Sequence, residues 1–175
     1  MKWFINSSKK FIFLIPLITL FCCYSNNTSA QTNKIYSLFV YNFTKYLEWP
    51  STNDDFTITV FGNSKVFEEL QIMVQKKSIN GHPILLKRTD NLDEINNCDL
   101  IYISSNKSRL IKEILIKIKD KAILLVGEQE GLARKGSGIS LFLNEDDNVK
   151  FEINKKAIEN QQLKVSSALI KLAIP

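Results

Sequence analysis

The hydrophobic positions between residues 34 and 48 recur with the spacing of an α-helix and cover an unusually wide arc. Two neighbouring faces of this helix are apolar, formed by Ile35, Phe39, Phe43 and Tyr46 and by Tyr36, Val40, Phe43 and Leu47. The polar stripe is narrow and consists of Lys34, Ser37, Thr44, Lys45 and Glu48. Such a pattern predicts a helix that is buried over most of its circumference. Because proline disfavours the helical conformation of the residue before it, Pro50 is predicted to end the helix, with Trp49 filling the core there.

After Pro50 the pattern alternates between strands and helices. Runs that are continuously apolar or rich in β-branched and aromatic residues predict strands at 56–62, 84–87, 98–104 and 122–127. Helical spacing predicts one helix that starts from a cap at Ser64 and runs through Met73. A second helix is predicted over 110–118, and the Asn-Gly pair at 80–81 predicts a tight turn.

The last third of the chain has a different pattern. A glycine-rich segment at 127–138 lacks the spacing of a phosphate-binding loop and is interpreted as a mobile connection. The segments 138–143 and 148–153 flank a polar turn and predict an antiparallel hairpin. Asn154 is predicted to cap a final helical region, whose apolar stripe includes Val165, Leu169 and Leu172. Together these elements predict an α/β fold: a single-domain three-layer sandwich with a central, largely parallel mixed sheet, flanking helices and a C-terminal antiparallel hairpin.

Residues 1–30 have the composition of an export signal. A basic start is followed by an apolar region of 14 residues at 11–24, and small residues stand at 28 and 30, which predicts cleavage after Ala30. The apolar run is shorter than the roughly 20 residues that a spanning helix needs. We therefore expect a signal peptide at 1–30, a mature domain at 31–175 and a periplasmic location. Cys22 and Cys23 leave a lipoprotein as the alternative.

The rest of the chain is nearly balanced in charge. Three of the 23 basic residues and none of the 18 acidic residues lie in the first 30 positions, so 20 basic and 18 acidic residues follow. This balance argues against a dedicated nucleic-acid-binding protein, which shows a concentrated basic surface. Cys98 is the single cysteine after the leader and cannot form an internal disulfide there. We expect a reduced, poorly reactive thiol inside the central sheet, with pairing between chains as the alternative.

The sequence contains no set of residues that points to catalysis or to a metal. The single histidine, His82, follows the Asn-Gly turn, and no CxxC, HExxH or spaced His/Cys motif is present. A nucleophile–base pair of Cys98 and His82 has no supporting motif. We therefore expect no enzyme activity, no catalytic or metal-binding residues and no cofactor.

Small polar residues follow three of the predicted strands. They are Gly62, Asn63 and Ser64, then Ser104, Ser105 and Asn106, and finally Gly127 and Glu128. If the strands are parallel, these residues meet at one carboxyl edge, where open α/β sheets bind ligands. The alternative is that they only cap the helices that follow. We keep them as candidate ligand-binding residues.

Five segments resemble, in order, the YfiR family of exported proteins. They are YNFTKYLEWP (41–50), FTITVFGN (56–63), NCDLIYIS (97–104), ILLVGEQEGLARKGSGISLFL (123–143) and NVKFEINKKAIENQQLKVSSALIKLA (148–173). The resemblance extends over about 34–173, nearly the whole expected mature chain. Family members carry further cysteines that form disulfides, whereas here only Cys98 has a counterpart. The glycine pair of the family is interrupted here as Gly136-Ser137-Gly138.

The resemblance implies a non-enzymatic periplasmic regulator. Members of the family restrain a membrane diguanylate cyclase by binding its periplasmic domain, and so control cyclic di-GMP and biofilm formation. Some relatives occur with, or fused to, sensor kinases. The implied partner is therefore the extracytoplasmic domain of an inner-membrane cyclase or kinase. The alternative is a small-ligand-binding sensory module that reports to a membrane histidine kinase.

These expectations assign roles to particular residues. The candidate partner-binding residues are Tyr36, Val40, Phe43, Leu47, Leu169 and Leu172, although burial is the favoured interpretation of the apolar arc. Trp49, Pro50 and Cys98 are expected to be structural. We expect no nucleic-acid partner and no stable membrane insertion after the leader is cleaved, and a homodimer is left open.

Overall fold

The computed structural model describes residues 27–50 and 55–174. Most of the expected signal peptide lies outside these residues, and the compact unit described below begins at Asn33. None of the helices within the described ranges is long and apolar enough to cross a membrane.

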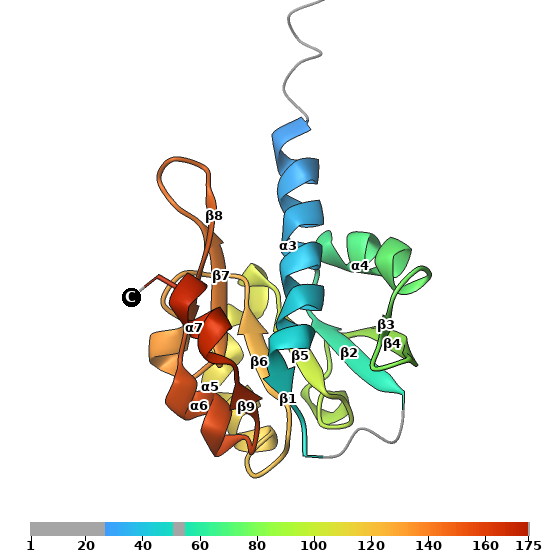
Figure 1. Cartoon of the computed structure of the whole chain (residues 1–175), viewed down its shortest axis with the longest axis vertical. Coiled ribbons are helices and arrows are strands. Elements are labelled where there is room, and N and C mark those ends of the chain that lie inside the picture. The colour runs from blue at the N-terminus through green and yellow to red at the C-terminus, as the bar shows by residue number, and fades with distance from the viewer. Residues whose placement is uncertain (1–26, 51–54, 175) are drawn as a thin grey trace, which may run out of the picture. The chain divides into compact units, whose positions relative to one another are not determined.

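The unit alternates strands and helices along most of its length (Figure 1). Its α-helices are α3 (Asn27–Tyr46), α4 (Val66–Val74), α5 (Ile111–Lys117), α6 (Lys155–Asn160) and α7 (Ser167–Leu172). Three short 3-10 helices are η2 (Leu92–Glu94), η3 (Ser105–Leu110) and η4 (Ala133–Lys135). The strands are β1 (Leu47–Glu48), β2 (Phe56–Phe61), β3 (Ser78–Ile79), β4 (His82–Thr89), β5 (Leu100–Ile103), β6 (Leu124–Gly127), β7 (Ile139–Leu143), β8 (Val149–Ile153) and β9 (Lys164–Val165).

Seven of these strands form one sheet in the order β3-β4-β2-β5-β6-β7-β8. The strands β4, β2, β5, β6 and β7 run parallel, and the two outer pairings, β3 with β4 and β7 with β8, are antiparallel. A separate antiparallel pair joins β1 to β9. The predicted α/β fold with a largely parallel mixed sheet and an antiparallel hairpin is confirmed.

Local sequence signals explain several element boundaries. Asn80 and Gly81 both have positive φ, at 52° and 84°, which is the geometry of the tight turn that joins β3 to β4. The Ser64 hydroxyl accepts the backbone N–H of Val66 at 3.2 Å, just before α4. The predicted cap is one residue too early, because the N-cap residue of α4 is Lys65, which makes no side-chain capping hydrogen bond. The Asn154 side chain accepts the N–H of Ala157 at 2.9 Å and caps α6.

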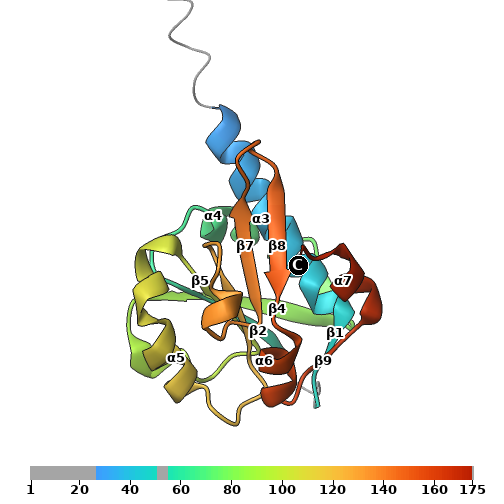
Figure 2. The same cartoon turned by 90° about the vertical axis from the view of Figure 1, so that its left-hand side faces the viewer.

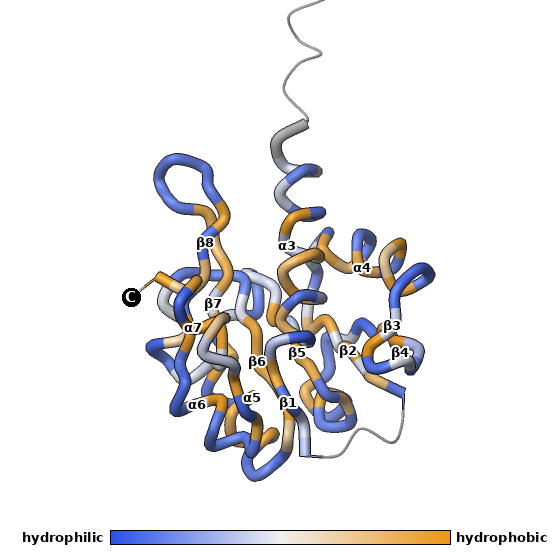
Figure 3. Tube along the Cα trace, in the orientation of Figure 1, coloured by the Kyte–Doolittle hydropathy of each residue, from blue (hydrophilic) through white to orange (hydrophobic). Residues whose placement is uncertain are grey.

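The sheet has a hydrophobic layer on each face. Strand β5 is buried along its whole length, with Leu100 and Tyr102 in the layer under α3 and Ile101 and Ile103 in the layer under α5. Figure 2 shows α3 and α5 on opposite sides of the sheet. Figure 3 shows the contrast between the apolar strand β6 and the hydrophilic connection from β7 to β8. The sheet is therefore covered on both faces, as the continuously apolar strands predict.

The prediction that Pro50 ends the first helix is wrong. Helix α3 already ends at Tyr46, because Leu47 and Glu48 form strand β1 and pair with Val165 and Lys164 of β9. Pro50 is exposed and follows this strand. The helix also begins earlier than the apolar pattern indicates, at Asn27 instead of Lys34.

Trp49 packs beside the core without being enclosed by it. Its side chain is half-buried, and its ring meets Phe56 edge-on with 4.9 Å between the ring centroids. Its indole N–H donates to the carbonyl oxygen of Asp99 at 3.2 Å. Trp49 therefore ties the segment after α3 to the chain just before β5, which is a structural role.

Two residues of the predicted polar stripe of α3 lie in the interior. Ser37 and Thr44 are buried, and each hydroxyl donates to a carbonyl oxygen three residues earlier, of Lys34 at 2.8 Å and Tyr41 at 2.7 Å. Hydrogen bonds of this kind satisfy a hydroxyl without a partner outside the helix. The buried arc of α3 is therefore shifted toward Ser37 and Thr44. As a result, some apolar side chains of the helix, such as Leu38 and Tyr46, remain on the surface.

Candidate functional site

The carboxyl ends of β2, β5 and β6 meet at one edge of the sheet, which brings together the polar residues expected there. The backbone N–H of Ser104 donates to the carbonyl of Phe61 at 3.0 Å, and that of Glu128 donates to Ile103 at 2.9 Å. Gly62 has a φ of 101°, and a side chain there would collide with the Ser104 hydroxyl. A glycine is therefore required for the close approach of the two strand ends.

Some of these polar residues form hydrogen bonds that stabilise the backbone at the strand ends. The buried Ser104 hydroxyl donates to the carbonyl of Phe61 at 2.9 Å and contacts the Asn106 side chain in a short hydrogen bond. Asn63, Ser105 and Asn106 are exposed, and Gly127 is buried within β6. The capping alternative thus accounts for several of the candidates.

Glu128 is the member of the set whose environment is unusual. It follows β6 and is half-buried. Burial raises the pKa of its carboxyl group, while Ser64, Tyr102 and the backbone of Ser105 partly offset that increase by hydrogen bonding. The Ser64 and Tyr102 hydroxyls are therefore close to the carboxyl group. Even so, neither Oε2 of Glu128 nor the Tyr102 hydroxyl makes a well-aligned hydrogen bond within the described residues.

Two tyrosines complete this environment. Tyr102 of β5 is fully buried, and its pKa is raised well above its usual value by burial and by the nearby Glu128 carboxyl group. Burial, followed by the same carboxyl group, raises the pKa of Tyr36 on α3 to about 12. We call Tyr36, Ser64, Tyr102 and Glu128 the carboxyl-edge cluster. Sequence reasoning found Ser64 and Glu128 but did not place the tyrosines there, because they come from the middle of a strand and from a helix.

The candidate partner-binding residues lie mostly in the core. Tyr36, Val40, Phe43, Leu47 and Leu169 are all buried, with at most 5% of their surface exposed. They are not on the surface of this structure, because the wide apolar arc packs against the sheet and the C-terminal segment. Leu172 alone of the six is exposed, at 66%.

Other apolar side chains of the same helices are exposed. Leu38 is 44% exposed and Tyr46 is 39% exposed, and Phe39 between them is half-buried against Phe43 and Phe151. Sequence reasoning missed Leu38, which belongs to neither of the two apolar faces identified for this helix. The two helices are adjacent, because the N–H of Ser166, just before α7, donates to the carbonyl of Tyr46 at 2.9 Å. We call Leu38, Phe39, Tyr46 and Leu172 the α3–α7 face.

Cys98 lies just before β5, in a bend, and not inside the sheet as expected. It is half-buried, and its thiol donates to the carbonyl oxygen of Ile95 at 3.2 Å. Burial raises the pKa of this thiol to about 12. The thiol is therefore protonated at neutral pH, and the described residues offer it no cysteine with which to pair.

The glycine-rich segment is held in place, which contradicts its interpretation as a mobile connection. The carboxylate of the buried Glu152 on β8 accepts the N–H of Gly131 at 3.0 Å and pairs with Arg134 at 2.6 Å. Gly136 has a φ of 113°, and a side chain there would meet Leu115 of α5. The segment is a packed corner of the fold with a buried anchor on β8.

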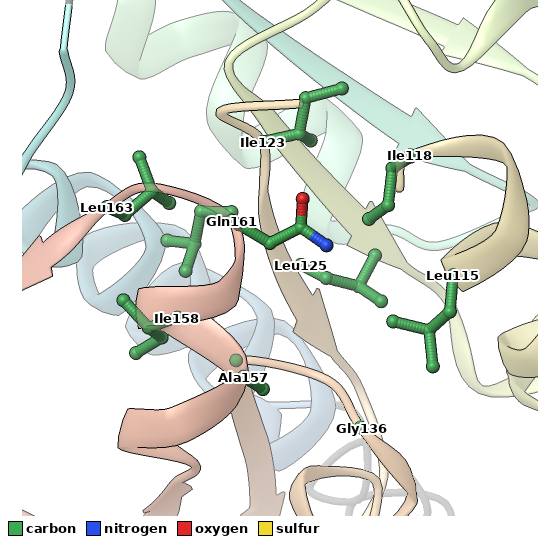
Figure 4. Close-up of a pocket in the computed structure, with 11 residues that line it drawn as sticks. Leu115, Ile118, Ile123, Leu125, Gly136, Ala157, Ile158, Gln161 and Leu163 are labelled. Atoms are coloured by element: carbon green, nitrogen blue, oxygen red, sulfur yellow. The ribbon is translucent and has the colours of Figure 1, made fainter. Parts of the chain in front are cut away.

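A narrow apolar pocket lies between α5 and α6 (Figure 4). Its lining includes Leu115, Ile118, Leu125, Gly136, Ile158 and Gln161. The Gln161 amide, oriented so that its nitrogen is the donor, bonds to the carbonyl of Ile118 at 2.9 Å and to that of Lys121. The side chain fills the centre of the view and leaves room for about one water molecule. This pocket is a packing detail and holds no reactive group.

Within the described residues, no group of three or more histidine, cysteine, aspartate or glutamate side chains is arranged to hold a metal ion. The carboxyl-edge cluster and the α3–α7 face remain as the candidate functional regions, although apolar side chains are also exposed elsewhere, as at Ile72 and Ile116.

Comparison with known proteins gives the family. The model of the YfiR/HmsC-like family matches residues 33–174, which is most of the chain. A solved structure of a conserved domain protein from Vibrio cholerae O1 biovar El Tor superposes with a TM-score of 0.58 at 12% sequence identity. The match covers 81% of this chain and 58% of that one, and at this identity it shows the fold alone. The chain belongs to the YfiR/HmsC-like family, a family of regulators.

Proposed function

We propose that this protein is an exported regulator that binds the extracytoplasmic domain of an inner-membrane signalling enzyme. The enzyme is most simply a diguanylate cyclase, whose output the protein lowers. Membership in the YfiR/HmsC-like family supports the regulatory class. The observation that carries the docking part of the proposal is the α3–α7 face, on which apolar side chains of two adjacent helices are exposed.

The chemistry of this face suits a protein partner. Exposed apolar side chains that gather on neighbouring elements are typical of interaction sites, and tyrosine is enriched among the residues that dominate binding energies. The helices α3 and α7 contain lysines, Lys34, Lys45 and Lys171, and no acidic residue. The proposed partner surface is therefore apolar with a rim of carboxylates, which would steer the encounter of the two proteins.

The test replaces one exposed residue at a time. Leu38→Asp and Leu172→Asp place a charge on the α3–α7 face without touching the core, and each should abolish capture of the partner. The matched control is Ile116→Asp on α5, because Ile116 is 76% exposed and α5 covers the opposite face of the sheet. A photo-crosslinking residue at position 46 should capture a membrane protein in the cell envelope, whereas the same residue at 116 should not.

The regulatory output is measured in cells. Deleting the gene should raise cyclic di-GMP and surface attachment, and wild type or Ile116→Asp should restore both to normal. Leu172→Asp should fail to restore them while reaching normal protein levels. Equal crosslinking from positions 46 and 116, or full rescue by both variants of the α3–α7 face, would contradict the proposal.

A second candidate function is a small-ligand-binding sensory module that reports to a membrane histidine kinase. The observation that favours it is the carboxyl-edge cluster, where the buried hydroxyl of Tyr102 and Oε2 of Glu128 lack aligned partners. A ligand that prefers the folded state must raise the apparent melting temperature. A thermal-shift screen of small polar molecules should therefore identify a hit that Tyr102→Phe loses, and a screen without one argues against this candidate.

A further inference from the structure

Strand β4 lies near one edge of the seven-stranded sheet, and most of its outer side has no partner strand (Figure 1). On its inner side, β4 pairs with β2 from Ile84 to Thr89. On its outer side, in the part of the chain that the structure describes, β3 pairs only with His82 and Pro83. The outer side of residues 84–89 is therefore an edge that another strand can join.

The direction of the backbone groups along this edge follows from one hydrogen bond. The N–H of Gly62 donates to the carbonyl of Thr89 at 3.0 Å, so that carbonyl faces inward, toward the end of β2. Successive residues of a strand direct their N–H and C=O groups to alternate sides. The backbone groups of Lys87 therefore also face β2, whereas those of Leu86 and Arg88 face outward. These two residues present donors and acceptors to a further strand.

The side chains along this edge change from apolar to basic. Leu85 is 43% exposed, the half-buried Leu86 follows, and Lys87 and Arg88 are exposed. Because side chains alternate between the two faces of a sheet, each face of the edge carries one leucine and one cation. On one face, Leu86 packs against the core, and the Arg88 guanidinium lies 4.8 Å from the centre of the Phe67 ring of α4. A strand placed beside β4 therefore meets the same order of side chains on both of its faces.

The charges around this edge are mostly of one sign. Residues 70–89 contain no acidic residue and four basic ones, Lys76, Lys77, Lys87 and Arg88. Glu68 of α4 pairs with Arg88 at 3.8 Å, and Asp90 pairs with Lys107 at 2.9 Å. A second copy of this chain would bring the same basic segment to the edge, and like charges that face each other across two strands are destabilising. An acidic strand is attracted instead.

We propose that β4 binds an extended, acidic segment of a partner protein, which joins the sheet as an additional strand. Its backbone bonds to the outward groups of Leu86 and Arg88. It places two apolar residues opposite the leucines and two acidic residues opposite Lys87 and Arg88. Strand addition takes its affinity from backbone hydrogen bonds and its specificity from the side chains. Charged residues that protect an exposed edge from indiscriminate pairing here select an acidic sequence.

This site goes beyond the proposed docking function, because it lies away from α7. The N–H of Ile174, just after α7, donates to the carbonyl of Phe151 on β8 at 3.0 Å. Strand β8 ends the sheet on the side opposite to β3 and β4. The β4 edge and Leu172 of the α3–α7 face can therefore be tested separately.

The experiment adds short capped peptides to the isotope-labelled protein and follows its amide groups by NMR. One probe contains two glutamates followed by two valines, for antiparallel pairing, and another has the reverse order, for parallel pairing. With at least one of them, the N–H groups of Leu86 and Arg88 should gain protection from hydrogen exchange. The N–H of Lys87, which already faces β2, should gain none. Peptides with lysine in place of glutamate, or with methylated nitrogens at alternate residues, should not bind, because they lack the charge or the backbone donors.

Variants test the charge of the edge. Lys87→Glu should weaken binding of the acidic peptide by about fivefold or more, because an attractive cross-strand pair becomes a repulsive one. Lys156→Glu makes the same change at an exposed position of α6, which follows β8, and should bind as the wild type does. Leu172→Asp should also bind normally, so failure of the docking proposal would leave this result unchanged.

Four outcomes would overturn the proposal. They are no binding of either acidic peptide, binding without protection of Leu86 and Arg88, equal binding of acidic and basic peptides, and protection of the same groups by dimerisation of the protein alone. The last outcome would assign the edge to a second copy of the chain. The comparison between peptides leaves the protein unchanged, so it decides even if Lys87→Glu does not fold.

Discussion

Replacing Trp49 tests how the segment after α3 is fixed to the rest of the molecule. Complete burial of a tryptophan would make Trp49→Ala cost about 3–5 kcal/mol. The side chain is only half-buried, and its specific contacts are the edge-on Phe56 ring at 4.9 Å and the indole bond to Asp99 at 3.2 Å. An aromatic pair adds about 0.5–1.5 kcal/mol, and a net hydrogen bond about the same. We therefore expect Trp49→Ala to lower the free energy of unfolding by about 2 kcal/mol.

Trp49→Phe separates these contributions. Phenylalanine keeps an aromatic ring against Phe56 and removes the indole donor, so its cost should be about 1 kcal/mol, the worth of the bond to Asp99. Urea unfolding measures both variants, and an unchanged slope shows that the unfolded states are comparable. In protein that lacks residues 1–30, Trp49 is the sole tryptophan, so its fluorescence reports the transition. A Trp49→Ala midpoint equal to wild type, or a loss above about 4 kcal/mol, would refute the half-buried anchor.

Two further predictions concern single residues. Cys98 should react with an aromatic disulfide reagent at pH 8 at least about tenfold more slowly in the native protein than in urea, because burial raises the pKa of its thiol to about 12 and thiolate is the reactive form. Rapid native labelling would contradict that environment. Gly62→Ala should lower stability by about 1–3 kcal/mol, because position 62 has positive φ and a side chain there would collide with Ser104. Gly81→Ala is the control, with positive φ and open space around it, and an equal loss in both would show that the collision has no cost.

The elements that could be predicted from the sequence are those with a local cause. Strands β5 and β6 are continuously apolar because both faces of the sheet are covered. The Asn-Gly turn and the Asn154 cap each depend on a few neighbouring residues. Such signals need no knowledge of the rest of the chain, and the structure confirms them.

The elements that the sequence pattern did not predict depend on residues that are far away in the chain. Strand β1 exists because Leu47 pairs with Val165, and no property of Leu47 indicates that partner. The same pairing divides the C-terminal region into α6, β9 and α7, although its apolar residues suggest one helical stretch. A proline three residues further on gave a sufficient local reason to end the helix, so the pattern alone placed the end at the wrong residue.

The candidate site shows the same division. Glu128 and Ser64 follow strands, so a parallel sheet brings them to one edge by topology alone. Tyr36 and Tyr102 belong to the cluster because the Glu128 carboxyl group contributes to the raised pKa of each, although both lie within other elements. Their sequence positions indicate burial, which is correct, but not the direction in which the hydroxyl groups point.

Helix α3 also shows why burial and the proposed docking are not alternatives. Its apolar arc is wide enough that Tyr36, Val40 and Phe43 fill the core while Leu38 and Tyr46 remain outside. The buried side fixes the helix to the sheet, and the exposed side is then presented at a defined angle beside α7. A docking surface on a rigid helix loses less conformational entropy on binding than one on a free loop.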